Sequence, residues 1–146
     1  MGTSQTSPDR HPEHLLVRSG GQRCAIPLDA APQVTGVLPT VPLPRSAPRL
    51  LGLAQFAGEP VAVVDLHGLL DPAGLAGGGY RLTVILRHRH GAAPLGLAVD
   101  DALGMVAVER DEDRRPDDPP WVAGRGRAAG QPAVLLDPAR LFEPVP

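Results

Sequence analysis

The sequence contains no lysine: all 14 of its basic residues are arginine, and 16 acidic residues outnumber them. The resulting formal net charge of −2 offers no overall attraction to nucleic-acid phosphates or to anionic lipid. Aromatic residues make up only 3% of the chain, so few rings are present on which bases could stack. These shortages count against a nucleic-acid-binding β-barrel module, which we keep only as an alternative.

Cysteine and long apolar runs are scarce as well. Cys24 is the only cysteine, which excludes an internal disulfide, and its apolar neighbours indicate a buried structural thiol rather than a nucleophile. No uninterrupted apolar run approaches the roughly 20 residues that span a membrane, and residues 1–13 lack the apolar centre of a signal peptide. We therefore expect a cytoplasmic protein without direct membrane insertion, which begins with a disordered leader over residues 1–13.

Motifs for nucleotide binding and nucleophilic catalysis are also missing. The glycine run at 77–79 is not followed by the Lys and the Ser or Thr that a phosphate loop requires. No Gly-x-Ser-x-Gly elbow occurs, and no Cys-His dyad can be argued from neighbouring residues. The sequence therefore predicts no catalytic residue and no cofactor.

Two histidines and two aspartates deserve separate consideration as metal ligands or acid–base groups. His88 and His90 would face one side of a strand and could bind zinc with a third ligand, but no paired cysteines or metalloprotease helix motif accompany them. Asp100 and Asp101 would point to opposite faces of a strand, and we interpret Asp100 as a strand-ending residue that binds local backbone amides. We predict no metal site, and a metal-dependent enzyme using His88, His90 and Asp100 stays as an alternative.

What the sequence does have is a rich supply of short aliphatic segments, and the most informative is 51–70. Gly58-Glu59-Pro60 has the composition of a tight turn, since Gly accepts positive φ and Pro cannot continue a ladder. The apolar run at 61–64 is typical of a strand that is covered on both faces. The sequence predicts a buried hairpin here, followed by a helical turn over 65–70.

The rest of the chain also favours an all-β fold, with the carboxylate of Asp137 and Pro138 predicted to open a short closing helix. A distorted helix or a 3₁₀ turn is expected over 28–33, and the proline-rich segment that follows should wrap over the surface. The charged run at 109–120 predicts a solvated loop. Strands are predicted at 15–17, 23–26, 34–38, 82–86, 95–99, 105–108 and 132–136.

Gly52–Gly58 followed by Pro60–Leu66 resembles the signature hairpin of CheW-like chemotaxis adaptor domains. Further segments are similar to this family in its order and at compatible spacing: Cys24–Leu28, Val34–Gly36, Leu95–Asp100, Trp121–Gly124 and Val134–Phe142. The resemblance covers roughly residues 14–142, leaving a short tail at 143–146.

The resemblance implies two small five-stranded β-barrel (SH3-like) lobes with a shared hydrophobic core and one or two short helices. It also implies a noncatalytic adaptor that joins a methyl-accepting chemoreceptor to a CheA-type histidine kinase, at receptor arrays on the inner face of the membrane. The receptor tip would lie in a groove between the lobes, and the kinase regulatory domain would dock through apolar strand surfaces. The residues expected to bind partners are Ala31, Gln33, Val34, Gly52, Gln55, Ala57, Gly58, Val99 and Asp100.

The sequence departs from the family pattern at two of these places. The turn that usually reads Asn-Leu-Arg-Gly is Gln55-Phe56-Ala57-Gly58 here, and Gln33 replaces a helix glutamate. Both changes remove a charge, so a charge-assisted bond to a receptor helix, of order 1.5 to 3 kcal/mol, cannot form from these positions. We therefore expect a divergent adaptor whose groove is more apolar than usual and whose receptor contact is altered.

Overall fold

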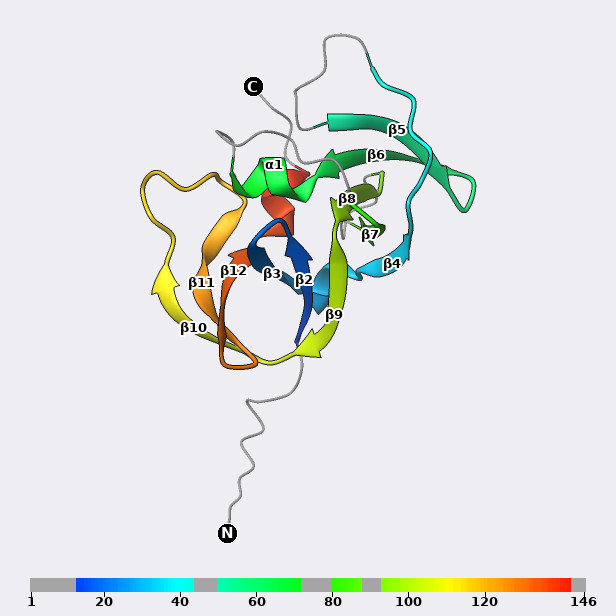
Figure 1. The fold of residues 1–146 in the computed structure, drawn as a ribbon. Helices are drawn as coiled ribbons and strands as arrows, with labels where there is room; N and C mark the ends of the chain where they lie inside the picture. The colour runs from blue at the N-terminus through cyan, green and yellow to red at the C-terminus, as the bar shows by residue number, and fades with distance from the viewer. Residues whose placement is uncertain (1–12, 44–49, 72–79, 88–92, 143–146) are drawn as a thin grey trace.

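The computed structural model describes residues 13–43, 50–71, 80–87 and 93–142, which form two sheets with three short helical segments (Figure 1). The first sheet contains β2 (His14–Ser19), β3 (Gln22–Pro27), β9 (Asp101–Val106), β10 (Val108–Asp113), β11 (Val122–Ala128) and β12 (Gln131–Leu136). The second contains β4 (Gln33–Gly36), β5 (Leu50–Phe56), β6 (Glu59–Asp65), β7 (Leu82–Leu86) and β8 (Leu95–Val99). The helical segments are η2 (Leu28–Ala30), α1 (Leu66–Leu70) and η3 (Pro138–Leu141).

The first lobe is built on the six-stranded sheet, with strand order β10-β11-β12-β3-β2-β9. Its two edge strands, β9 and β10, are separated only by Ala107, so the sheet curls until its edges meet at one bend of the chain (Figure 1). The interior holds Leu16, Ala128 and Ala133, with Val106 and Val108 packed against them. Counted as one bent strand, β9–β10 gives the five strands that the resemblance implied.

The second lobe is built on the five-stranded sheet, with order β4-β7-β8-β6-β5. Val41, beyond the end of β4, pairs with Leu53 of β5 through two backbone hydrogen bonds of 2.8 and 2.9 Å. Gly52 makes this approach possible, because a Cβ at that position would collide with the Val41 carbonyl. Val61 and Val63 lie inside this lobe. Neither sheet closes into a barrel through a continuous ladder, but both curl around an interior of their own.

One hydrophobic core joins the two lobes, as the resemblance implied. Its buried members come from β2, β3, η2, α1, β7, β8 and β12, so both sheets and both ends of the chain contribute. Cys24 is fully buried in this core, and burial raises the pKa of its thiol to about 12, which confirms a structural thiol. Trp121 packs against the same core, and its indole N–H donates to the Leu69 carbonyl at 2.7 Å.

The two lobes repeat one supersecondary unit, namely an antiparallel hairpin followed by a short helical segment. The β5–β6 and β11–β12 hairpins both turn through Ala-Gly, and both second strands pair in parallel with another strand, β8 or β3. The matching turn residues have nearly equal φ angles: 52° and 81° at Ala57 and Gly58, and 52° and 77° at Ala129 and Gly130. The other identical positions of the repeat are Gly52 and Gly124, Pro60 and Pro132, Asp65 and Asp137, and Leu69 and Leu141.

The predicted loop at 109–120 is wrong over its first half, because residues 109–113 belong to strand β10. Charged side chains are tolerated there since β10 is an edge strand that is exposed almost throughout, and its order comes from the backbone ladder to β11. The remainder is also anchored: the Arg125 guanidinium bonds both carboxylate oxygens of Asp118 at 2.9 and 2.8 Å. Strand β11, which supplies Arg125, was not predicted.

Other expectations are refined by the structure. Of the distorted helix or 3₁₀ turn expected over 28–33, the structure has the 3₁₀ turn η2, Leu28–Ala30, which is capped by Ala31, and the strand expected at 34–38 is β4. Asp137 does precede the closing segment with Pro138 after it, but its carboxylate makes no capping hydrogen bond, so that part of the prediction is wrong. Residues 1–12 of the expected leader, the glycine run at 77–79, His88, His90 and the tail at 143–146 lie outside the described residues, whereas Glu13 makes backbone hydrogen bonds to Val106 and Leu28.

Candidate partner-binding surface

The tip of the β5–β6 hairpin is the most exposed part of the predicted site. Phe56 pairs with Glu59, which leaves Ala57 and Gly58 as a two-residue turn with positive φ at both positions, the geometry of a type I′ turn. Gln55, Ala57 and Gly58 are all exposed. The left-handed conformation of Ala57 costs about 1 kcal/mol or more relative to glycine. The tip therefore has a strained residue at a position that a partner could contact.

A second exposed element lies where η2 leads into β4. Ala31 is also left-handed, with φ 51°, and its N–H donates to the Leu28 carbonyl at 2.9 Å, which closes the helical turn. Gln33 and Val34 follow on β4, the edge strand of the second sheet, and both are exposed. The predicted residues Ala31, Gln33 and Val34 therefore form a continuous exposed segment.

Arg87 joins these two elements. Its backbone N–H donates to the Ala30 carbonyl at 3.0 Å, and its guanidinium lies 3.0 Å from the Glu59 carboxylate at the start of β6. The Arg87–Glu59 pair is well exposed, so it adds roughly 1 kcal/mol at most to stability. Its main effect is to hold the end of η2 and the start of β6 next to each other. Sequence reasoning missed Arg87; its only signal was its place directly after the apolar run of β7.

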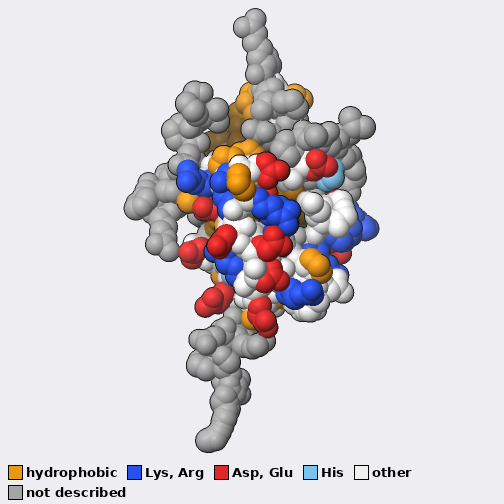
Figure 2. All heavy atoms as spheres, turned by 90° about the vertical axis from the view of Figure 1, so that its left-hand side faces the viewer, with side chains coloured by type: hydrophobic (Ala, Val, Ile, Leu, Met, Phe, Trp, Pro, Cys, Tyr) orange, Lys and Arg blue, Asp and Glu red, His pale blue; other side chains and the backbone are white. Residues whose placement is uncertain are grey.

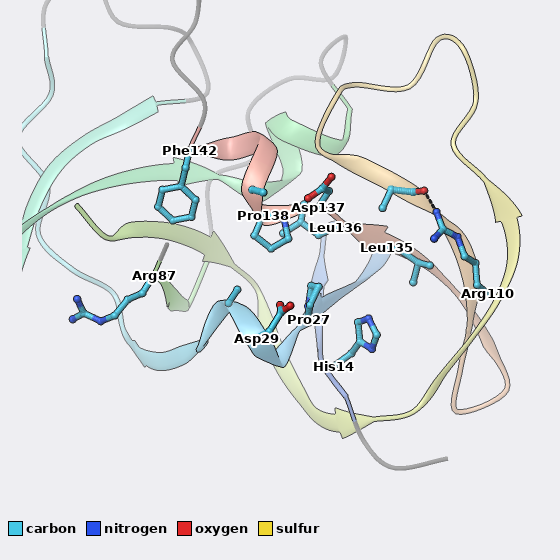
Figure 3. A pocket seen from close by; sticks show the side chains of 13 residues that line it. His14, Pro27, Asp29, Arg87, Arg110, Leu135, Leu136, Asp137, Pro138 and Phe142 are labelled. Carbon is cyan, nitrogen blue, oxygen red and sulfur yellow. Dashed lines mark hydrogen bonds between the residues drawn. The ribbon is translucent and has the colours of Figure 1, made fainter. Parts of the chain in front are cut away.

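A groove of about 520 Å³ opens beside this region, lined by first-lobe strands, η2 and the closing segment η3, with Arg87 from the end of β7. Figure 3 shows His14, Pro27 and Asp29 on one side of it and Leu136, Asp137 and Pro138 on the other. Leu135 and Phe142 add to its apolar lining, and Arg87 and Arg110 stand at its two ends (Figure 3). Burial lowers the pKa of His14, so this ring is biased toward its neutral form. The groove thus has a mixed lining, with His14, Asp29 and Asp137 among apolar side chains in its walls and an arginine at each end.

None of the nine predicted residues lines this groove, although Ala31 directly follows a lining residue, Ala30. Six of them, Ala31, Gln33, Val34, Gln55, Ala57 and Gly58, lie on the elements that Arg87 connects.

Val99 and Asp100 lie at the other end of the second sheet. Ala98 pairs with Asp65, which is five residues along β6 from Pro60, so they are separated from the hairpin turn by roughly 16 Å or more at 3.3 Å per residue. The Val99 side chain is fully buried in the shared core and does not reach the surface. Asp100 does bind a backbone amide, as predicted, but the amide is the remote one of Gly20, at 2.9 Å.

These contacts of Asp100 connect the lobes. Its carboxylate accepts from the β2–β3 turn and lies 3.6 Å from the Arg18 guanidinium, while its own N–H donates to the Arg18 carbonyl. Nearby, the Asp65 carboxylate caps α1 by accepting from the His67 N–H at 3.1 Å. Burial raises the pKa of Asp65. Asp100 is thus committed to a structural role at the lobe junction.

Gly52 is buried, but the strand segments around it form an exposed apolar patch. Val41 is the most exposed large hydrophobic residue in the described part of the chain, at 68%, and it lies beside Leu53 through the bridge described above. The apolar patch consists of Val34, Val37, Val41 and Leu53. Such a patch at a sheet edge is typical of a protein-binding surface.

The described residues contain no group of three or more His, Cys, Asp or Glu side chains arranged to hold a metal ion. Within the same residues, no helix is long and apolar enough to cross a membrane.

A family model for the CheW-like domain matches residues 13–145 of this chain. The chain belongs to the CheW-like family. Members of this family are noncatalytic scaffolds, and the assignment supports a scaffold or adaptor of chemotaxis. Among solved structures, the scaffolding protein TtCheW from Thermoanaerobacter tengcongensis has a similar fold, with a TM-score of 0.68 over 86% of this chain and 89% of that chain. The two sequences are only 16% identical. A search of curated proteins found no match.

In this CheW-like chain, charges next to the neutral turn occur as an ion pair. Ala57 and Gln33 are neutral, but Arg87 and Glu59 place a guanidinium and a carboxylate between them. These two groups neutralise one another, so the surface as a whole stays without a free charge at the turn. The CheW-like fold is therefore kept while the chemistry of its exposed end differs from the family pattern.

Proposed function

We propose that this protein is a noncatalytic cytoplasmic adaptor that couples a chemoreceptor to a CheA-type histidine kinase at receptor arrays, with a divergent receptor contact. The observation that supports the proposal is the meeting of η2, β4 and the β5–β6 turn around Arg87, which also lines the groove, in a fold whose two lobes share one core. A shared core holds both walls of the groove at fixed positions, as a scaffold requires. The family assignment supports the same conclusion.

The groove and its neighbouring turn suit a helical receptor segment. An amphipathic helix would place its apolar side chains against Pro27, Leu136 and Phe142, which line the groove. Its polar side chains would meet the charged rim. Ala57 at the turn and Gln33 on β4 can make only neutral contacts with a partner. Affinity for an ordinary receptor, whose tip would pair with charged residues at these two positions, should therefore be reduced.

The kinase regulatory domain requires a different surface, so that both partners bind together. Apolar strand surfaces are the expected docking sites, and two are exposed among the described residues. One is the apolar patch around Val41, and the other is the pair Leu103 and Met105 on β9.

Restoring the missing charges tests the receptor side of the proposal. Binding of a cytoplasmic fragment of an ordinary chemoreceptor is measured by isothermal titration calorimetry with the wild type and with the double variant Ala57→Arg, Gln33→Glu. We expect weak binding by the wild type and at least tenfold tighter binding by the variant, since charge-assisted bonds contribute about 1.5 to 3 kcal/mol. Ala129→Arg, the same change in the matching turn of the other lobe, serves as the control and should change nothing.

The proposal fails if the wild type binds no CheA-type regulatory domain. Tight wild-type binding of the ordinary receptor fragment, unchanged by the double variant, would leave an adaptor but remove its divergent receptor contact.

A further inference from the structure

The groove described above continues the interior of the first lobe. Leu16 on β2 and Val108 on β10 pack inside this lobe. Side chains two residues apart on a strand point to the same face, so His14 and Arg110 extend the same inward-facing rows, and both line the groove (Figure 3). A groove of about 520 Å³ at the mouth of a small curled sheet has the size and the place of a small-ligand site.

Two β-bulges hold Arg110 at this mouth. The ladder between β10 and β11 skips one residue after Arg110, and the ladder between β11 and β12 skips Ala123. The Arg110 guanidinium donates to the carbonyl of Ala123, and Gly124 leaves room for it, since a Cβ there would lie 2.8 Å from a guanidinium nitrogen. The Asp113 carboxylate is 3.7 Å away, beyond hydrogen-bond distance. Because a guanidinium has five N–H donors, Arg110 keeps donors for a ligand.

Asp137 brings the opposite charge to the same groove. Its side chain is half-buried and makes no capping hydrogen bond, and within the part of the chain that the structure describes it has no ion pair, not even with Arg110. Charges on the outer face of the lobe are paired instead, as Asp118 is with Arg125. Figure 2 shows arginine and acidic side chains interleaved on the side of the molecule that lies to the left in Figure 1. The groove thus holds a cation and an anion apart.

A second acceptor faces the groove from the wall opposite Asp137 (Figure 3). The Nδ1 atom of His14 is buried and has no hydrogen-bond partner among the described residues. Burial lowers the pKa of His14, and in the neutral ring Nδ1 can accept a hydrogen bond. Buried polar atoms nearly always have a partner, so a ligand that satisfies His14 and Asp137 has to donate. A primary ammonium, with three N–H groups, is a donor of this kind.

A second hollow, also of about 520 Å³, meets the groove at Arg110, Ala123 and Asp137, which line both. Arg114 and Arg140 line this hollow too. Three guanidinium groups therefore face a single carboxylate there. Guanidinium groups bind carboxylates through two parallel hydrogen bonds, so this side of the junction suits the anionic end of a ligand.

We propose that the junction of the two hollows binds a free α-amino acid with an apolar side chain. The ligand's carboxylate binds Arg110, its ammonium binds Asp137, and its side chain packs against Leu135 and Leu136 in the groove. An anion alone would meet the Asp137 carboxylate, and an amine alone would meet the Arg110 guanidinium. The same groove is proposed above for a receptor helix, so the amino acid and the receptor would exclude one another. That consequence rests on the proposed function, whereas binding of the amino acid does not.

Titration of the full chain with L-leucine, followed by heteronuclear NMR, tests the site without any protein partner. The amide resonances of Ala123 and Asp137 should shift saturably, at concentrations of about 10 mM or below. Two analogues of leucine test each charge on the wild type, so the result does not depend on the folding of a variant. 4-Methylpentanoate lacks the ammonium and 3-methylbutylamine lacks the carboxylate, and each should bind at least tenfold more weakly than leucine.

Variants locate the two charges that the ligand meets. Asp137→Asn and Arg110→Gln should each weaken leucine binding at least tenfold. Asp111→Asn and Arg127→Gln are the matched controls, because they make the same changes in an exposed pair on β10 and β11, and they should leave the affinity within twofold. Circular dichroism confirms that each variant is folded.

The inference is supported by saturable leucine binding with tenfold losses for both analogues and both site variants. It is overturned if neither L-leucine nor L-phenylalanine gives saturable shifts up to about 10 mM. A loss of less than tenfold for either analogue also overturns it, since a site for an anion or an amine alone would remain. None of these results touches the adaptor, which fails only if no CheA-type regulatory domain is bound.

Discussion

The shared core predicts that the two lobes unfold as one unit, and Leu97→Ala tests this directly. Leu97 is fully buried on β8, within the core that joins both sheets and α1. Truncating a buried leucine removes its transfer free energy and leaves a cavity, so the free energy of unfolding should fall by about 2 to 5 kcal/mol. A domain of this size has about 5 to 15 kcal/mol of stability, so the variant should remain folded at 25 °C.

Two probes in different lobes show whether that loss is shared. The fluorescence of Trp121, the only tryptophan, follows the first lobe and its contact with α1, while amide exchange in β5 and β6 follows the second lobe. In Leu97→Ala, the urea transitions reported by the two probes should shift to lower urea concentration together, and both should give the same loss in the free energy of unfolding. Leu103→Ala, at an exposed leucine of β9, is the matched control and should cost less than about 1 kcal/mol. Separate transitions, or a loss confined to one probe, would refute a common core.

Three further predictions concern single sites. The Arg125 guanidinium depresses the pKa of Asp118 to about 2. This folded-state pKa lies below the unfolded value of about 3.9. The stabilisation by the Asp118–Arg125 pair is therefore present above about pH 4 and is lost as the pH falls through about 2. Asp118→Asn should therefore cost about 1 to 2 kcal/mol at pH 7 and much less near pH 2, as urea unfolding at both pH values would show. Ala57→Gly and Ala129→Gly should each raise stability by up to about 1 kcal/mol, since positive φ suits glycine, and a lower melting temperature would contradict the strain assigned there. Cys24, buried and with its thiol pKa raised to about 12, should react with iodoacetamide only at the rate of global unfolding, whereas fast labelling of the native protein would show local opening.

Strands made of aliphatic residues could be predicted from the sequence, because the residues that are apolar in the sequence are the ones that the fold buries. Val61 and Val63 face the interior of the second lobe while Val64 packs on the shared core, as expected for a strand covered on both faces. β10 and β11 could not be predicted in this way. The order of β10 comes from the backbone ladder to a partner strand, and its side chains are charged and exposed, while glycines in β11 remove the alternation that marks a strand.

The candidate site was predicted in part, and the limit was tertiary placement. The hairpin turn and the η2–β4 segment were found because their residues resemble a family motif. Arg87 and the groove could not be found, since they depend on β7 ending beside η2 and on β12 lying across from it. Val99 and Asp100 were placed with the turn by resemblance, but the strand register puts them at the far end of the sheet and ties Asp100 to Gly20.

The central claim, that this protein is an adaptor for a CheA-type kinase, is tested most directly by one binding measurement. The purified full chain is titrated with a CheA-type regulatory domain in a calorimeter at physiological salt. A saturable complex of one adaptor with one regulatory domain is the predicted result. No detectable heat at protein concentrations of order 100 μM, which corresponds to an affinity weaker than about −5.5 kcal/mol, would contradict the claim.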